Sequence, residues 1–273
     1  MNKMFYLAVL VMSAFGTMVF ASCGSDHSNE NEYGSEWTVN SGNGYSNNQG
    51  KSIAGMVINK DASGKVVSIK GRGEGENVTF EYKNAGTRSA STPDVVMTVV
   101  SRGERTVFNL FLNEQGYVSH CDETEYSKGE YPEHGKWDFT YNNDGQLLTV
   151  FRSEDGNEKT TIVYEGGNIV ETTEVSEHEP YDKNIHKIFY TSQKVANPIL
   201  NKGGIMMFDE TLGVDLDEMK YAYYAGMLGN PTKHLPVRSV EEDGEQNVFT
   251  WKLNKSGYPT SLRTDGDFYR FVW

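Results

Sequence analysis

Three segments that share one pattern decide the fold: Phe108–Gly116 reads FNLFLNEQG, Trp137–Gly145 reads WDFTYNNDG, and Phe249–Gly257 reads FTWKLNKSG. In each segment three large apolar residues alternate with other residues, and Asn-x-x-Gly follows directly. Alternation with a period of two places the apolar side chains on one face of a β-strand. The Asn side chain favours turn initiation, and the Gly can adopt the left-handed conformation that closes a hairpin. These segments therefore predict antiparallel hairpins.

Further segments extend this pattern along the chain. Ile58–Gly64 is a looser relative of the hairpin with two extra residues, and Tyr164–Gly167 is one residue shorter. The closely spaced Gly residues leave no room for crossover helices, so we expect a meander. The fold class that follows is mainly all-β, an antiparallel meander of repeated hairpins that forms a curved or partly closed sheet. Other predicted strands are Val95–Val100, Thr160–Glu165, Asn168–Glu174 and Ile185–Thr191.

One short α-helix is expected near 214–228. Asp215 and Glu218 have the spacing of a capping box, and Gly229 with Pro231 would end the helix. The flanking loops, 192–213 and 229–247, are rich in Gly, Asn and Pro and offer the most accessible place for a binding surface. The apolar stripe of this helix is expected to pack in the core and consists of Leu216, Met219, Tyr223 and Met227.

The charge balance excludes one class of partner. The chain has 25 Lys and Arg against 38 Asp and Glu, a net charge of −13. A protein that binds nucleic acid by neutralising phosphates needs the opposite balance, so no nucleic-acid partner is expected. The 33 aromatic residues (4 Trp, 16 Tyr, 13 Phe) and 28 Gly against 7 Pro are typical of a turn-rich β protein.

The N-terminus has the features of an export signal. An apolar run from Met4 to Phe20 follows Lys3 and ends in small residues, which is typical of a cleaved signal peptide. The ending Phe20-Ala21-Ser22-Cys23 resembles the lipobox of bacterial lipoproteins. That resemblance implies cleavage after residue 22 and attachment of diacylglycerol and a further acyl chain such as palmitate at Cys23. Two or three acyl chains would anchor the protein firmly to a membrane. An ordinary secretory signal with a coincidental Cys is the alternative.

Three regions are therefore predicted: a signal peptide at 1–22, an acidic tether rich in Gly, Ser and Asn at 23–51, and a single β-rich domain at 52–273. The tether contains too little apolar surface to offset the entropy of ordering it. Its acidic residues, beginning with Asp26, resemble the export signal that sends some Gram-negative lipoproteins to the cell surface. This resemblance implies an outer-membrane, lipid-anchored protein and favours the surface-facing over the periplasm-facing orientation.

Taken together, the lipobox, the tether and the hairpins resemble a family of bacterial lipoproteins with a domain of unknown function described as porin-like in fold. The resemblance is strongest in three late stretches: Ala196–Gly213, Tyr221–Pro236 and Asn254–Leu262. The family implies a β fold and supplies no catalytic residue. We expect strands of about five to seven residues, whereas a membrane-spanning strand needs about 9–11. The expectation is thus a soluble sheet and not a pore.

The sequence assigns no catalytic residue, no cofactor and no metal site. The segment His178–His186 lacks the His-Glu-x-x-His spacing of a zinc site, and we interpret it as a solvated acidic loop. Asn142–Gly145 lacks the spaced acids of a calcium loop, and Gly44–Ser52 has one residue too many between its glycines for a phosphate loop. Cys121 is predicted to be a buried thiol, with His120 on the opposite face. Aromatic residues that could stack on sugars are predicted to lie in the core instead: Trp137, Trp251, Tyr221, Tyr223 and Tyr224.

Three functions remain open. The favoured one is a non-enzymatic, lipid-anchored envelope protein that binds a glycan, a peptide or an envelope protein through loops on a β scaffold. The second is a cell-surface carbohydrate hydrolase, which would need two carboxyl groups about 5–10 Å apart in a cleft. The third is a carrier of an apolar ligand in envelope assembly. Its cavity would be lined by the strands Val95–Val100 and Val107–Leu112.

Overall fold

The computed structural model describes residues 51–53, 56–70, 76–83, 92–153, 157–177, 183–205, 212–264 and 268–273. The chain divides into two units, Met1–Tyr33 and Gly34–Trp273, and every described residue belongs to the second. The described residues begin at Lys51. They exclude the predicted signal peptide 1–22, the lipid-attachment residue Cys23 and all of the predicted tether 23–51 except Lys51. The region boundaries therefore stay a prediction.

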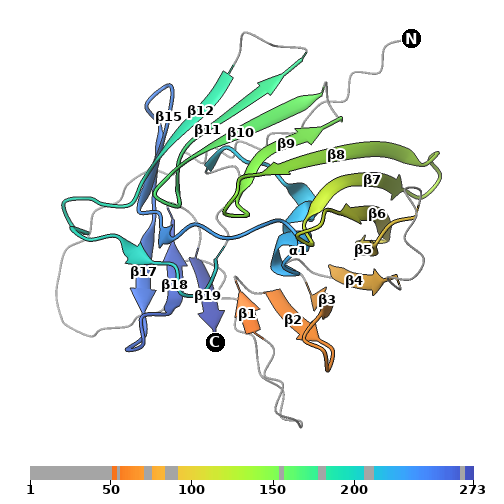
Figure 1. Cartoon of the computed structure of the whole chain (residues 1–273), viewed down its shortest axis with the longest axis horizontal. Helices are drawn as coiled ribbons and strands as arrows, with labels where there is room; N and C mark the ends of the chain where they lie inside the picture. The colour runs from red at the N-terminus through yellow and green to blue at the C-terminus, as the bar shows by residue number, and fades with distance from the viewer. Residues whose placement is uncertain are drawn as a thin grey trace, which may run out of the picture. The chain divides into compact units, whose positions relative to one another are not determined.

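Antiparallel strands dominate the described chain (Figure 1). Several of them, including β6, β7, β8 and β11, have nine residues, so the expectation of strands of five to seven residues was wrong for these. The strands are β1 (Lys51–Ile53), β2 (Met56–Lys60), β3 (Val66–Lys70), β4 (Asn77–Tyr82), β5 (Val95–Ser101), β6 (Glu104–Leu112), β7 (Val118–Tyr126), β8 (Glu133–Tyr141), β9 (Leu147–Arg152), β10 (Glu158–Glu165), β11 (Asn168–Ser176), β12 (Lys183–Phe189), β13 (Ile199–Leu200), β14 (His234–Leu235), β15 (Arg238–Glu241), β16 (Gln246–Val248), β17 (Thr250–Leu253), β18 (Pro259–Arg263) and β19 (Phe268–Val272).

The strands form one curved, partly closed sheet, as the sequence predicts. Each strand from β1 to β12 pairs antiparallel with the next, and β12 then pairs with β15 and β15 with β16. At the other end β17 pairs with β18, β18 with β19, and β19 with β1. The first and last strands therefore lie side by side. At the other end of the two runs, β16 and β17 share no ladder within the described residues, and the chain passes from one strand to the next through Phe249. The short strands β13 and β14 pair separately.

The three Asn-x-x-Gly turns have one geometry. Asn142 shows it: its side-chain Oδ1 accepts the backbone N–H groups of Asp144 at 2.9 Å and Gln146 at 2.8 Å, and its carbonyl accepts the N–H of Gly145 at 3.0 Å. The turns at Asn113 and Asn254 repeat all three bonds. The strand register shifts by one residue beside each turn, which is a β-bulge that the Gly permits with its positive φ. The hairpin prediction is confirmed at all three sites.

The looser relatives differ in detail. In the first hairpin the turn begins at Asp61, not Asn59, because the Asp61 carboxylate accepts the same pair of backbone N–H groups. A further turn with the same backbone bonds, Glu241–Gly244, was not predicted because it lacks the initial Asn or Asp. The hairpin after Tyr164 closes through Gly166 and Gly167, both at positive φ, as a two-residue turn.

The predicted helix is shorter than expected. A 3-10 helix, η4 (Asp217–Met219), leads into α1 (Lys220–Tyr224). The helix ends at Tyr224, two residues before Gly226, because Gly226 adopts a positive φ and the N–H of Met227 bonds back to the carbonyl of Ala222. Gly229 is not the residue that ends it. The capping box does not form, since neither helix start has a side-chain cap. Within the described residues, no helix is both long and apolar enough to span a bilayer.

Residues Leu212–Gly226, here called the core segment, cover the concave face of the sheet. Figure 1 shows α1 enclosed by the curving strands. The segment contacts strands from distant parts of the sheet: the carbonyl of Leu212 accepts the Thr172 hydroxyl on β11, and the Tyr221 hydroxyl donates to Glu76 beside β4 at 2.6 Å. The predicted stripe of the helix is buried, but so are Tyr221 and Ala222 between its members. Because side chains on several sides of the helix are buried, the helix lies within the hydrophobic core and does not expose a broad polar face.

Residues Met227–His234, here called the end segment, fasten several turns at one end of the sheet. Asn230 donates from its backbone to the carbonyl of Gly145 and from its side chain to that of Asp144, both at 2.7 Å. The Tyr117 hydroxyl donates to Asn230 Oδ1 at 3.2 Å. Lys233 donates to the carbonyl of Gly167 at 2.9 Å. Three neighbouring hairpins are thereby held by one segment.

Substituting Gly229 tests this contact. An added Cβ would lie 2.6 Å from the carbonyl oxygen of Gly145, a backbone atom that cannot move aside, whereas a Cβ at Gly226 would meet nothing within 4 Å. Both residues have a positive φ, so both alanine variants carry a similar backbone penalty of ~1–2 kcal/mol. We expect Gly229→Ala to lower the midpoint of thermal unfolding clearly more than Gly226→Ala. Equal midpoints for the two variants would contradict the close approach.

Candidate functional site

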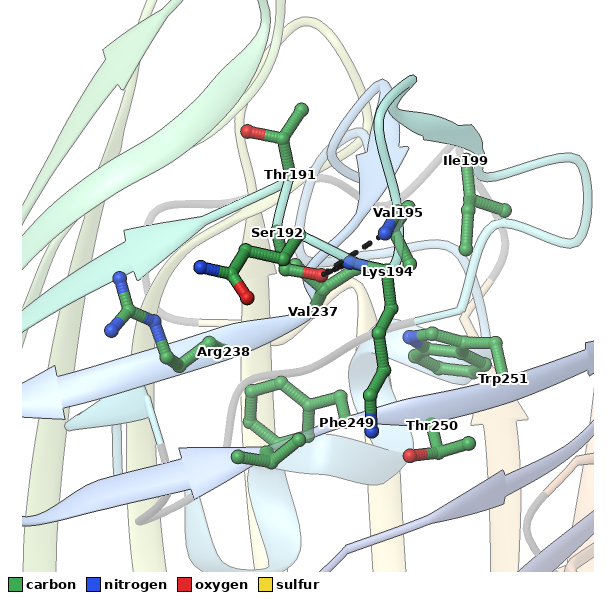
Figure 2. A pocket seen from close by; sticks show the side chains of 12 residues that line it. Thr191, Ser192, Lys194, Val195, Ile199, Val237, Arg238, Phe249, Thr250 and Trp251 are labelled. Carbon is green, nitrogen blue, oxygen red and sulfur yellow. Dashed lines mark hydrogen bonds between the residues drawn. The ribbon is translucent and has the colours of Figure 1, made fainter.

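A cleft opens beside the interruption between β16 and β17 (Figure 2). Its volume of about 560 Å³ falls within the range of small-molecule sites. It is built from the loop after β12, from β15 and from the strands on both sides of Phe249. The lining residues are Thr191, Ser192, Gln193, Lys194, Val195, Ile199, Val237, Arg238, Val248, Phe249, Thr250 and Trp251.

The floor of the cleft is apolar and firmly held. Val237 and Phe249 are buried, and their backbones are joined by the bond from the N–H of Phe249 to the carbonyl of Val237 at 3.0 Å. Trp251 is half-buried, and its Nε1 donates to the carbonyl of Pro236 at 2.7 Å. This bond fixes the plane of the indole at one side of the cleft.

The rim of the cleft is a tight turn. The backbones of Ser192 and Val195 bond to each other in both directions, at 2.9 and 3.2 Å. The Ser192 hydroxyl also accepts the N–H groups of Lys194 and Val195. Figure 2 shows the Lys194 side chain running from this turn toward Phe249 and Thr250. A rigid rim with a cation aimed at an aromatic floor is suited to holding a ligand in one orientation.

The charge of the cleft is opposite to that of the chain. Its two charged residues are Lys194 and Arg238, and none of the described residues lining it is Asp or Glu. The Arg238 guanidinium lies over the ring of Phe189, with its central carbon 4.2 Å from the ring centroid, and donates to Gln246 at 3.2 Å. Across the described part of the chain neither cation forms an ion pair.

A second polar cluster ties the core segment to the sheet. The Arg152 guanidinium on β9 forms an ion pair with Asp217 at 2.8 Å and lies 3.8 Å from Asp215. The same guanidinium covers the ring of Trp137, whose Nε1 donates to the buried carboxylate of Glu123 at 2.6 Å. These contacts connect three adjacent strands to the core segment. We interpret the cluster as structural.

Burial changes the acidity of two carboxyl groups in this cluster. Desolvation raises the pKa of Asp217 above its ordinary value, although Arg152 opposes the change. Desolvation also raises the pKa of Glu218, and the neighbouring charge of Asp217 adds to it. Both groups therefore hold their protons more tightly in the folded chain than in the unfolded chain.

The remaining candidates are placed as follows. Cys121 is fully buried, as predicted, and burial raises the pKa of its thiol well above the ordinary value, so it is unreactive. His120 faces away from it and contacts Asp138 and Asp122. His178 lies outside the described residues. His186 is buried on β12, so placing it in a solvated loop was wrong. Across the described chain, no group of three or more His, Cys, Asp or Glu side chains could hold a metal ion.

The prediction that the five aromatic residues lie in the core is largely confirmed. Trp137, Tyr221 and Tyr223 are buried, and Tyr224 packs against the core. Trp251 also packs against the core but lines the cleft as well. The expected binding loops contribute as well, since residues 192–195, 199, 237 and 238 border the cleft. Lys194 and Arg238 were not predicted, because no motif marks them and only the pairing of β12 with β15 brings them together.

The sequence and the fold can now be compared with known proteins. The model of one family matches residues 57–261, and its description is "Domain of unknown function (DUF4595) with porin-like fold". The chain belongs to this family. No curated protein matches the sequence. The family membership confirms the resemblance to a domain of unknown function with a porin-like fold, whereas the lipoprotein part of that resemblance stays a prediction. The family assigns no activity.

Two solved structures resemble this chain. A porin-like protein from Bacteroides uniformis superposes with a TM-score of 0.57 at 17% identity, and the match covers 80% of this chain and 88% of the other. A porin-like protein from Bacteroides vulgatus has a TM-score of 0.49 at 12% identity, covering 80% of this chain and 91% of the other. At such low identity the first likeness shows a shared fold alone.

The raised pKa of Glu218 predicts a pH-dependent stability. Because the folded chain binds this proton more tightly, the contribution of Glu218 is most favourable at acidic pH and is lost as the pH rises through the raised pKa. Glu218→Gln cannot ionise, so we expect its unfolding midpoint at neutral pH to exceed that of the wild type. The difference should vanish near pH ~3–4, where the carboxyl is protonated in both states.

The control is Glu242→Gln, because Glu242 lies exposed in the turn between β15 and β16. Its unfolding midpoint should follow that of the wild type at every pH. If the Glu218 variant behaved in the same way as this control, desolvation of the Glu218 carboxyl would be refuted.

Proposed function

We propose that this protein is a non-enzymatic binding module of the bacterial cell envelope, held to the outer membrane by an acylated Cys23 and facing the cell surface. Its ligand site is the cleft between the Ser192–Val195 turn and the strands around Phe249. The observation that carries the proposal is the cleft itself, which combines an aromatic floor, hydroxyl groups on its rim and two cations. Such a combination of apolar surface with a few convergent polar groups is typical of ligand sites.

The hydrolase hypothesis has less support. Glycoside hydrolysis requires two carboxyl groups at the reacting bond, and no described residue that lines the cleft carries one. In the core segment, the carboxyl groups of Asp215 and Asp217 contact Arg152 instead. The cleft is therefore equipped to hold a ligand rather than to cleave it.

The carrier hypothesis also has less support. On the strands that would line its cavity, Val95, Met97, Phe108 and Leu110 are fully buried and belong to the hydrophobic core. Their space is already filled by protein side chains. An apolar ligand would have to displace the core to enter there.

Binding can be tested with a panel of oligosaccharides and peptides against the full chain, measured by calorimetry. Phe249 forms the floor of the cleft, so a charged residue at this position would disturb the fold. Thr250 also lines the cleft but is exposed, so Thr250→Trp fills the cleft and should change the stability of the strand little. We expect at least one ligand to bind the wild type and to lose its affinity with Thr250→Trp. The same substitution at the exposed Thr140, on the outer face of β8, should leave binding unchanged.

The anchor is tested separately. Cys23→Ala removes the only sulfur at the predicted cleavage site, so the variant cannot be acylated there. We expect the variant to appear in the soluble fraction, whereas the wild type stays with the membranes and is extracted by detergent. Retention of Cys23→Ala in the membrane fraction would contradict the lipid anchor.

A further inference from the structure

The cleft has a positive local charge in a chain of strongly negative charge. The chain carries a net charge of −13, yet the two charged residues that line the cleft are Lys194 and Arg238. Two cations beside one cleft attract an anion, and none of the described residues that line the cleft supplies a negative charge to compete with it.

The two cations lie on opposite sides of the aromatic floor. Lys194 extends from the rim toward Phe249 and Thr250, and Arg238 projects from β15 on the side away from Trp251 (Figure 2). The Arg238 guanidinium is oriented by the Phe189 ring beneath it and by its bond to Gln246. An oriented guanidinium suits a planar, two-oxygen acceptor such as a carboxylate.

The remaining lining is suited to a sugar ring. Hydroxyl groups of Thr191, Ser192 and Thr250 border the cleft, and the indole of Trp251 is fixed at one side by its bond to Pro236. An aromatic ring packs against the apolar face of a sugar while hydroxyl groups exchange hydrogen bonds with its edge. The overall negative charge disfavours long polyanions, so a short ligand with few charges fits best.

We propose that the cleft binds an acidic oligosaccharide and recognises the carboxylate of a uronic acid through Arg238 and Lys194. This inference rests on the proposed function and adds the chemical class of the ligand. The sugar ring lies on the aromatic floor beside Trp251, and the carboxylate lies between the two cations.

The experiment uses three matched probes with the full chain purified in a non-ionic detergent. Trigalacturonic acid supplies the carboxylates, its methyl ester has the same shape without the charges, and triglutamate has the charges without the sugar rings. Binding is measured by calorimetry and by the change in tryptophan fluorescence. We expect the acid alone to bind, with an affinity that falls as ionic strength rises.

Variants assign the binding to the cleft. Arg238→Gln and Lys194→Gln should each weaken binding of the acid by about tenfold, the usual effect of losing one hydrogen bond to a charged group. Lys128→Gln is the control, since Lys128 is an exposed cation in the turn between β7 and β8, outside the cleft. Unfolding midpoints of all three variants verify that each is folded.

Each outcome decides between the two claims. Equal binding of the acid and its methyl ester, or of triglutamate and the acid, would overturn the assignment of a uronic acid while leaving a binding module intact. Binding of the acid that is unaffected by both cleft substitutions would also overturn it, because the site would lie elsewhere. No binding by these probes, together with no binding in the wider panel of neutral oligosaccharides and peptides, would overturn both proposals.

Discussion

The structure depends on covering the concave face of a single curved sheet. Strand after strand directs apolar side chains to this face, among them Met97, Phe108 and Leu110, and a sheet of this kind needs a second layer to bury them. The same chain supplies that layer as the core segment, whose residues pack on the strands from several sides. The polar contacts at its edge, from Arg152 to Asp217 and from Tyr221 to Glu76, fix its position. The need for this second layer explains why the short helix α1 packs inside the sheet and why the hairpins are attached to the segment that contains it.

The cleft arises where the regular ladder is interrupted. Between β16 and β17 the chain changes partners from β15 to β18, with Phe249 as the connecting residue. The change of partner leaves a gap that the loop after β12 borders but does not fill. A feature of strand pairing thus places the cleft, and the surrounding side chains give it its chemical character.

The hairpins could be predicted from the sequence because their signal is local. In Trp137–Gly145 the strand alternation, the Asn side chain and the Gly conformation all lie within nine residues. The turn at Glu241 has the same backbone bonds but no initial Asn, so its signal was too weak. The end of α1 was predicted four residues too late, near 228 instead of at Tyr224, since both Gly226 and Gly229 permit a helix end and only the packing chooses between them.

The cleft could not be predicted for the opposite reason. Lys194, Arg238 and Trp251 are far apart in the sequence, and each is unremarkable in its own segment. They meet because β12 pairs with β15 and β15 with β16, an arrangement that skips the intervening stretch with β13, α1 and β14. The sequence indicated the correct loops, but the partners across the cleft depend on pairings between distant strands.

The pairing of β1 with β19 has a consequence for biosynthesis. These strands, Lys51–Ile53 and Phe268–Val272, are among the first and the last described parts to leave the ribosome. Until the final strand has emerged, the outer edge of β1 has no hydrogen-bonding neighbour, and such an edge is prone to pairing with other polypeptides. The nascent chain therefore carries an unpaired strand edge until β19 has emerged. A holding chaperone that shields this edge would have its greatest effect just before β19 emerges.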